Sequence, residues 1–114
     1  GGNAIAARLN APRHVAAFQN TLYFSDTENH RVRMVVLGTG VIETVAGNGT
    51  AGFAGDGSEA KTAQLNMPRG LLIFRRTLFV ADTGNNRVRQ VSIAGDHRIS
   101  TVLGGGTQTV EDIG

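Results

Sequence analysis

The sequence predicts an all-β protein built from two four-stranded antiparallel units. Three observations lead to this prediction: a long internal repeat, a high glycine content and a series of short apolar runs. Sixteen glycines among 114 residues, with only two prolines, indicate many tight turns between short strands. With 40% hydrophobic and 18% charged residues, the composition is that of a globular chain.

The repeat covers nearly the whole chain. Three segments recur at one constant offset, and a fourth recurs one position later than that offset because of a single insertion. The matching segments are 9–13 with 65–69, 21–27 with 77–83, 29–33 with 85–89, and 42–47 with 99–104. Because the order is kept throughout, the chain contains two copies of one unit, which we divide into residues 1–56 and 57–114.

Each copy predicts four short strands joined by hairpins. We expect these strands over residues 15–18, 22–25, 31–36 and 41–46, and again over 71–74, 77–81, 87–93 and 98–103. The first is a fully apolar run, suited to a strand buried on both faces. The third alternates, which sets Arg31 and Arg33 on one face and Val32 on the other. Four hairpin-connected strands followed by a longer crossing are the layout of a β-propeller blade.

Residues 47–66 join the two copies and are too long and too rich in glycine for a hairpin. The second half of this linker, residues 58–65, predicts a short helix with Ser58 as its N-cap. The glycines of the first half do not form a nucleotide loop, because no Gly-Lys-Ser/Thr motif follows a strand.

Two motifs resemble the NHL-repeat family: Asp-Thr-Glu-Asn-His-Arg-Val-Arg at 26–33 and Asp-Thr-Gly-Asn-Asn-Arg-Val-Arg at 82–89. The glycine-rich segment 47–57, leading into Leu-Asn-Met-Pro at 65–68, strengthens the resemblance, which extends to Gly106. Neither copy keeps the leucine that gives the family its third letter, and residues 107–114 leave the linker pattern. The resemblance implies blades of a six-bladed propeller that acts in protein or RNA recognition; a few relatives are lyases or hydrolases with a metal in the central channel.

Two blades cannot close a ring, and an open pair exposes sheet faces that neighbouring blades normally bury. We therefore expect either part of a larger propeller or a self-associating piece, of which three copies supply six blades.

Each repeat contains one aspartate and two arginines at the second and third strands. We expect Asp26 to pair with Arg31, and Asp82 with Arg87, as ties between a turn and the next strand. Identical recurrence favours this structural role over the alternative, in which the arginines meet RNA phosphates or an acidic partner.

Four further residues form the candidate ligand-binding site. Arg13 and Arg69 each follow a proline at the entry to the first strand of a copy. In propellers resembling this one, that entry lies on the same rim as the turn between the second and third strands, which carries Asn29 and Asn85. Arginine and amide groups on one rim can bind carboxylates or phosphates. The alternative is an arginine that is solvated or bonded to the crossing loop.

The triplet Asp82-Thr83-Gly84 resembles that of retroviral-type aspartic proteases, but Glu28 occupies the glycine position in the first copy and does not fit a catalytic turn. His14, His30 and His97 lack the spacing of a metal site, so we expect no metal and no other cofactor. No apolar run approaches the roughly 20 residues needed to span a bilayer, so we expect no membrane partner.

The sequence thus predicts a non-catalytic binding or scaffold module that recognises a protein or peptide. RNA binding is the alternative, because ten arginines are available but aromatic residues for base stacking are scarce. A second alternative is part of a metal-dependent lyase or hydrolase whose catalytic residues lie on other blades. The compartment is not determined by the sequence.

Overall fold

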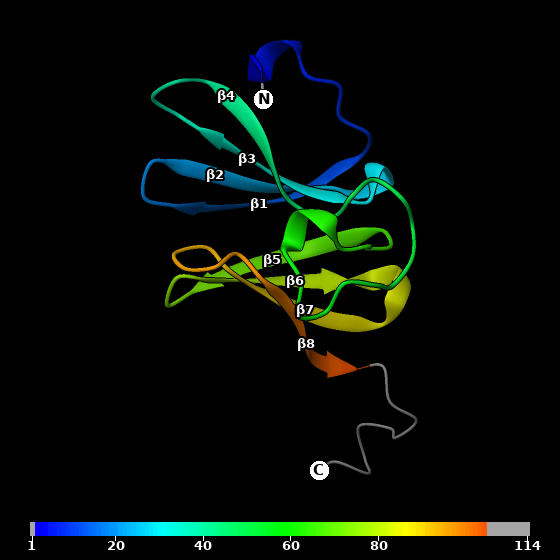
Figure 1. Cartoon of the computed structure of the whole chain (residues 1–114). Coiled ribbons are helices and arrows are strands. Elements are labelled where there is room, and N and C mark those ends of the chain that lie inside the picture. Colours follow the sequence, from blue (N-terminus) through cyan, green and yellow to red (C-terminus); the bar gives the residue numbers. More distant parts are fainter. Residues whose placement is uncertain (1, 105–114) are drawn as a thin grey trace.

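A computed structural model describes residues 2–104 and contains two four-stranded antiparallel sheets. Sheet 1 has the order β1-β2-β3-β4 and sheet 2 the order β5-β6-β7-β8, so every strand pairs with its neighbour in the chain. The two sheets lie one above the other in Figure 1, joined by the linker. The strands are β1 (Pro12–Phe18), β2 (Thr21–Asp26), β3 (Arg31–Val36), β4 (Val41–Ala46), β5 (Pro68–Phe74), β6 (Thr77–Asp82), β7 (Arg87–Ser92) and β8 (Ile99–Gly104).

The predicted all-β architecture with two four-stranded sheets is confirmed. The repeat also appears in the register, because Pro12 lies opposite Asp26 in sheet 1 and Pro68 opposite Asp82 in sheet 2. Beyond each proline the register shifts by a β-bulge before regular pairing resumes. Pairing at the prolines makes β1 and β5 longer than the apolar runs at 15–18 and 71–74. Residues 107–114, which leave the linker pattern in the sequence, lie outside the described residues.

Short 3-10 helices are the only helices among residues 2–104: η1 (Ala4–Ala6), η2 (Thr27–Asn29), η3 (Ala60–Thr62) and η4 (Thr83–Asn85). None of them has the length or apolar character needed to cross a membrane. The helix predicted over 58–65, with Ser58 as its cap, is wrong: only η3 forms there, and it begins after Glu59 without a side-chain cap. The reason is competition from backbone pairing, because Ile99 donates to the Ser58 carbonyl and Gln64 forms a bridge with Ala54.

The core lies between the sheets and includes the end of the linker. β1 and β2 pack against β5, and β4 packs against η3. Burial of this apolar surface is the main term that holds the sheets together. Fully buried side chains of this core include Val32, Leu65, Leu78, Val80, Val91 and Ile99.

Polar contacts also connect the sheets. The His14 imidazole of β1, together with the Thr27 hydroxyl and the His30 imidazole of the η2 turn, meets the backbone at the start of sheet 2. These hydrogen bonds run from Thr27 Oγ1 to the Pro68 carbonyl (2.7 Å), from Leu71 N to His14 Nδ1 (3.2 Å) and from Met67 N to His30 Nδ1 (3.1 Å).

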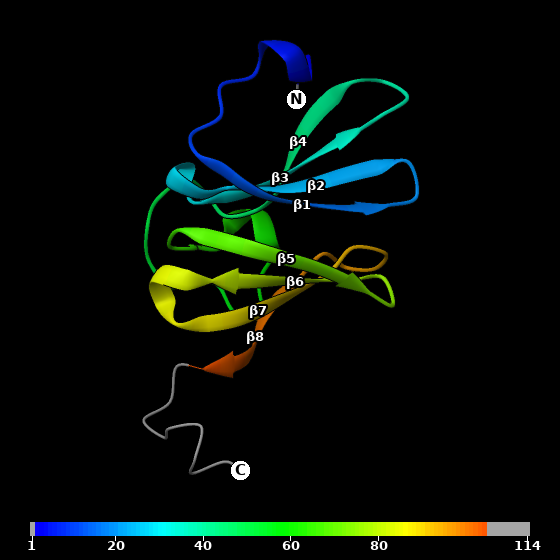
Figure 2. The same cartoon turned by 180° about the vertical axis from the view of Figure 1, so that it is seen from behind.

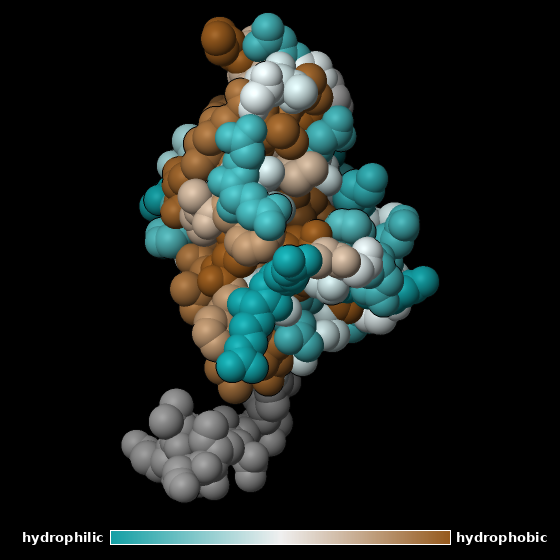
Figure 3. All heavy atoms as spheres, turned by 90° about the vertical axis from the view of Figure 1, so that its left-hand side faces the viewer, coloured by the Kyte–Doolittle hydropathy of each residue, from teal (hydrophilic) through white to brown (hydrophobic). Residues whose placement is uncertain are grey.

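β1 is not buried on both faces, contrary to the prediction. Val15 and Ala17 are exposed, because sheet 2 packs against the opposite face of β1, whereas Phe24 and Ile42 on the same face of sheet 1 are buried. Hydrophobic residues also reach the surface at the hairpin end of the molecule, where Figure 3 shows them as a brown band running from one sheet to the other. On the first strand of sheet 2, Leu72 and Phe74 are exposed.

Candidate ligand-binding rim

One end of both sheets carries the segments in which the sequence predicts a site. We call this end the rim; it consists of the starts of β1 and β5, the turns η2 and η4, and residues 47–57 of the linker. Figures 1 and 2 show both turns and the linker on the same side of the stacked sheets. Because β1 packs against β5, their starts are neighbours. The rim therefore brings together the segments that carry Arg13, Arg69, Asn29 and Asn85.

A buried aspartate organises each half of the rim. Asp26 ends β2 and Asp82 ends β6, and both side chains are fully buried. Oδ1 of Asp26 accepts the backbone N–H of Asn10 at 2.7 Å, and Oδ1 of Asp82 accepts that of Asn66 at 2.7 Å. A buried carboxylate requires such donors. The two aspartates thereby fix the chain that enters β1 and β5 against the turn that leaves β2 and β6.

The predicted ligand-binding asparagines take part in the same turns. Asn29 Nδ2 donates to Oδ2 of Asp26 at 2.9 Å, and Asn85 Nδ2 donates to Oδ2 of Asp82 at 2.7 Å. Asn85 Nδ2 also donates to the carbonyl of Gly52 at 2.9 Å, which uses both of its hydrogens. The amide nitrogens are thus held by the turns, and ligand contact through the amide oxygens stays a prediction.

The predicted pairing of Asp26 with Arg31 is wrong. Asp26 forms its ion pair with Arg33, with 3.3 Å between Oδ2 and Nη1. Arg31 lies directly opposite Asp26 across the strand pair, but its guanidinium turns to the linker and donates to the Asn48 carbonyl at 3.2 Å. Both arginines project from the same face of β3, so their spacing alone does not decide which one reaches the carboxylate.

The predicted pairing of Asp82 with Arg87 is wrong for a related reason. Arg89 forms the ion pair instead, at 2.9 Å from Nη1 to Oδ2, with both side chains fully buried. The Arg87 guanidinium lies over the ring of Phe53, 3.6 Å from its centroid, and that of Arg89 lies 4.6 Å from the same centroid. The linker aromatic therefore binds both arginines by cation–π contacts.

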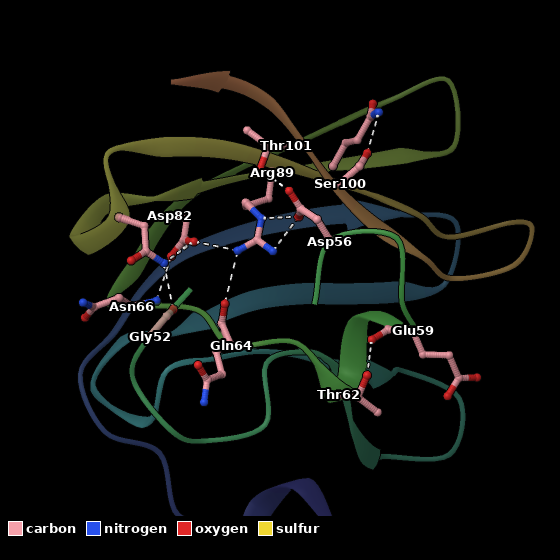
Figure 4. Close-up of polar contacts among 12 residues, drawn as sticks. Gly52, Asp56, Glu59, Thr62, Gln64, Asn66, Asp82, Arg89, Ser100 and Thr101 are labelled. Atoms are coloured by element: carbon pink, nitrogen blue, oxygen red, sulfur yellow. Dashed lines mark hydrogen bonds and ion pairs between the residues drawn. The ribbon is translucent and has the colours of Figure 1, made fainter. Parts of the chain in front are cut away.

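Arg89 is the centre of the polar network drawn in Figure 4. Its Nε and Nη2 donate to Oδ1 of Asp56 at 3.1 and 2.8 Å, and its Nη1 donates to the Gln64 carbonyl at 3.2 Å. Thr101 Oγ1 donates to Oδ2 of Asp56 at 2.6 Å. Burial acts to raise the pKa of the Asp56 carboxyl, but the bonds from Thr101 and Arg89 outweigh it and hold this pKa below its usual value.

Sequence reasoning missed Phe53 and Asp56, because it treated the linker glycines only as turn residues. One signal was available. Each repeat motif sets two arginines on one strand face and supplies a single aspartate, so one arginine per repeat needs a partner from elsewhere. The preceding linker contains two acids, Asp56 and Glu59, and Asp56 is the one that pairs with Arg89.

Arg13 and Arg69 differ from the arginines of β3 and β7 described above. Both are exposed, and neither side chain forms a hydrogen bond or an ion pair with another residue of the described range 2–104. Each follows the proline that begins its strand and lies within the β-bulge there, between the paired positions on either side, and its side chain is exposed. Such groups can form bidentate bonds with a carboxylate or a phosphate.

A cleft of about 420 Å³ lies between the sheets away from the rim. Its wall is mainly apolar and includes Tyr23 and Ile93, and burial raises the pKa of the Tyr23 hydroxyl. Acidic and basic side chains, including Glu59 and Lys61, are mixed around it. Because charges of both signs surround it, the cleft is less suited to a charged ligand than the rim.

Within residues 2–104, no group of three or more histidine, aspartate or glutamate side chains lies close enough together to hold a metal ion. His14 and His30 accept the hydrogen bonds between the sheets described above.

No family model matches the chain. Among curated proteins, it is similar to NHL repeat-containing protein 2 from Gallus gallus, with 31% identity over 102 residues, and from Homo sapiens, with 32% identity over 95 residues. These alignments cover 90% and 83% of the chain but only 14% and 13% of the relatives. Protein SUPPRESSOR OF QUENCHING 1, chloroplastic, from Arabidopsis thaliana is 39% identical over 80 residues, which are 69% of this chain and 7% of that protein. The chain thus spans a small part of the length of the relatives it matches.

Proposed function

Because the chain belongs to the NHL-repeat family, we propose that it forms two neighbouring blades of a β-propeller ring and that its rim binds an acidic segment of a protein or peptide. The role proposed for these two blades is non-catalytic recognition. The observation that carries the proposal is the pair of exposed guanidinium groups of Arg13 and Arg69 at the starts of two adjacent strands.

The ring is proposed because the two sheets stack in the same orientation and expose further faces of the same kind. Other repeats of a longer chain are the proposed source of the remaining blades, since the relatives are much longer than this chain. The alternative source is self-association, with three copies giving six blades. Sedimentation equilibrium separates the two: a stable trimer of the isolated chain would overturn the longer-chain proposal.

An acidic ligand is supported by the chemistry of the rim. Arg13 and Arg69 are exposed and their guanidinium groups are accessible, whereas the buried aspartates of the rim already have internal partners. Arg31 and Arg87 add positive charge beside them from the starts of β3 and β7. A carboxylate that approaches this end meets several arginines, and charge-assisted bonds of this kind are about twice as strong as neutral ones.

RNA is the second candidate, and one observation favours it. The ring of Phe53 is 40% exposed on the rim and stacked with Arg87, an arrangement that can continue as stacking on a base. The acidic peptide ranks first because Phe53 is the single exposed aromatic among the described rim residues.

Fluorescence anisotropy with a labelled octaglutamate peptide and a labelled octauridine RNA tests both candidates. The double variant Arg13→Gln, Arg69→Gln is expected to bind the peptide about tenfold more weakly than the unaltered chain, equivalent to about 1.4 kcal/mol. The matched control is Arg75→Gln, Arg76→Gln, which removes two exposed arginines from the β5–β6 hairpin at the opposite end.

Equal peptide affinity of the two double variants would overturn the rim assignment. Tighter binding of the RNA than of the peptide, with a steep fall of affinity as salt is added, would favour RNA instead. The hairpin control keeps the net charge equal, so a difference between the variants reports position rather than overall charge.

A further inference from the structure

Arg33 in sheet 1 and Arg89 in sheet 2 occupy the same position of the repeat but have different surroundings. Arg89 is fully buried, and all its guanidinium nitrogens have partners. Arg33 is 16% exposed and makes one bond, to Asp26 at 3.3 Å. Its Nε is buried and has no hydrogen-bond partner among the described residues. A buried donor without a partner costs about 1–3 kcal/mol, so such groups call for an explanation.

The missing partner of Arg33 can be identified from its counterpart. Nε of Arg89 donates to Asp56, which belongs to the linker that precedes sheet 2. At the offset that relates Arg33 to Arg89, no residue in 1–114 corresponds to Asp56 for sheet 1. What Arg33 lacks is therefore a carboxylate carried by a linker of the same kind.

The first strand of sheet 1 and the segment that enters it are also less covered than their counterparts in sheet 2. Val15 is 60% exposed, whereas its repeat counterpart Leu71 is 6% exposed because sheet 1 covers it. Leu9 is 43% exposed, whereas Leu65 is fully buried. Apolar residues that are buried between the two sheets in the second repeat are thus exposed at the same positions of the first repeat.

We propose that Arg33 and this exposed part of sheet 1 form the docking site for a preceding NHL-type repeat, whose glycine-rich linker places an aspartate on Nε of Arg33. The proposal rests on the function proposed above in treating the chain as part of a propeller. The contact between the preceding repeat and sheet 1 then has one chemical requirement. The linker of the preceding repeat carries a carboxylate at the position of Asp56, as this chain's own linker does for Arg89.

A second copy of this chain does not meet that requirement. The alignment that matches Gly47 with Gly104 at the ends of the fourth strands places Ile113 at the position of Asp56 and Val110 at that of Phe53. The nearest acid, Asp112, is one position too early. The segment after sheet 2 therefore lacks both the carboxylate and the aromatic ring that hold Arg89, and the preceding repeat must come from a different sequence.

The test supplies the missing linker. A second copy of residues 47–56 is fused directly before Gly1, which corresponds to Gly57 in the repeat, so that its terminal aspartate stands where Asp56 stands before sheet 2. The control carries asparagine in place of that aspartate and is otherwise identical. The aspartate extension is expected to raise Tm by about 4–8 °C relative to the asparagine extension.

Arg33→Gln in both extended chains is expected to remove this difference. The Nε–H signal of Arg33, observed by NMR in the unsubstituted chains, gives a readout that needs no arginine variant. It is expected to shift and to exchange more slowly with the aspartate extension only.

Equal Tm values with an unchanged Nε–H signal would overturn the inference and leave the octaglutamate result at the rim untouched. Concentration-dependent protection of the Arg33 Nε–H in the unextended chain would also overturn it, because a second copy would then supply the partner. Conversely, loss of the peptide result would remove the rim function without affecting the comparison of the two extensions.

Discussion

Replacing Arg89 by methionine is expected to lower the free energy of unfolding by about 3–5 kcal/mol. Arg89 is fully buried and pairs with the equally buried Asp82 at 2.9 Å. Methionine fills much of the same volume but leaves the Asp82 carboxylate with its two remaining donors, from Asn66 and Asn85, and without a counter-charge. At about 0.1 kcal/mol per residue, a chain of this length has a stability of about 11 kcal/mol, so the loss is a large fraction of the total.

Urea unfolding followed by circular dichroism measures this change, and Arg33→Met in sheet 1 is the matched comparison. Arg33 makes a single bond of 3.3 Å to Asp26 and is partly exposed, so its replacement is expected to cost about 1–2 kcal/mol. If the Arg89 variant loses less stability than the Arg33 variant, the buried network is not the central contact described here.

Three further predictions follow from the same contacts. Because the pKa of Asp56 is lowered in the folded chain, the contribution of this carboxylate to stability is complete above about pH 4 and is lost as the pH falls through the lowered pKa. Asp56→Asn should therefore make the urea midpoint less dependent on pH on the acid side. An unchanged slope of urea midpoint against pH would contradict this. The two-residue β5–β6 turn has positive φ at both Arg75 (51°) and Arg76 (60°), so Asn at the first and Gly at the second should raise the free energy of unfolding by about 1–2 kcal/mol, whereas a lower Tm would argue against a strained turn. Leu71→Ala should cost about 2–5 kcal/mol in urea unfolding and Val15→Ala less than about 0.5 kcal/mol, and similar losses at both sites would mean that the face of β1 is covered in solution.

The sequence predicted the strands and their pairing because these depend on local patterns. Alternation and turn residues repeat at a nearly constant offset, so β3 and β4 were predicted with the bounds that the structure has. The starts of β1 and β5 were predicted too late, because a bulge follows each opening proline and hides the continued pairing from an apolar-run argument.

The candidate site was less predictable, because its contacts depend on the path of the linker. Arg31 and Arg33 share a strand face, and the choice between them for Asp26 is made by the carbonyl of Asn48, which binds Arg31. Nothing in the spacing of the repeat shows that Asn48 comes close. In the same way, burial on both faces was expected for the apolar run that contains Val15, but burial depends on a neighbouring sheet and not on the strand itself.

The imidazoles of His14 and His30 have a consequence for how the repeats can be arranged. Each accepts a backbone N–H from the following sheet, yet the equivalent residues of the second repeat are Gly70 and Asn86, neither of which has an imidazole to offer. The interface between these two repeats therefore differs from the interface that the second repeat can form with a repeat that follows it. Exchanging the order of the two repeats would leave the backbone outline unchanged but remove both bonds, so the chain specifies its own succession of modules rather than a set of interchangeable parts.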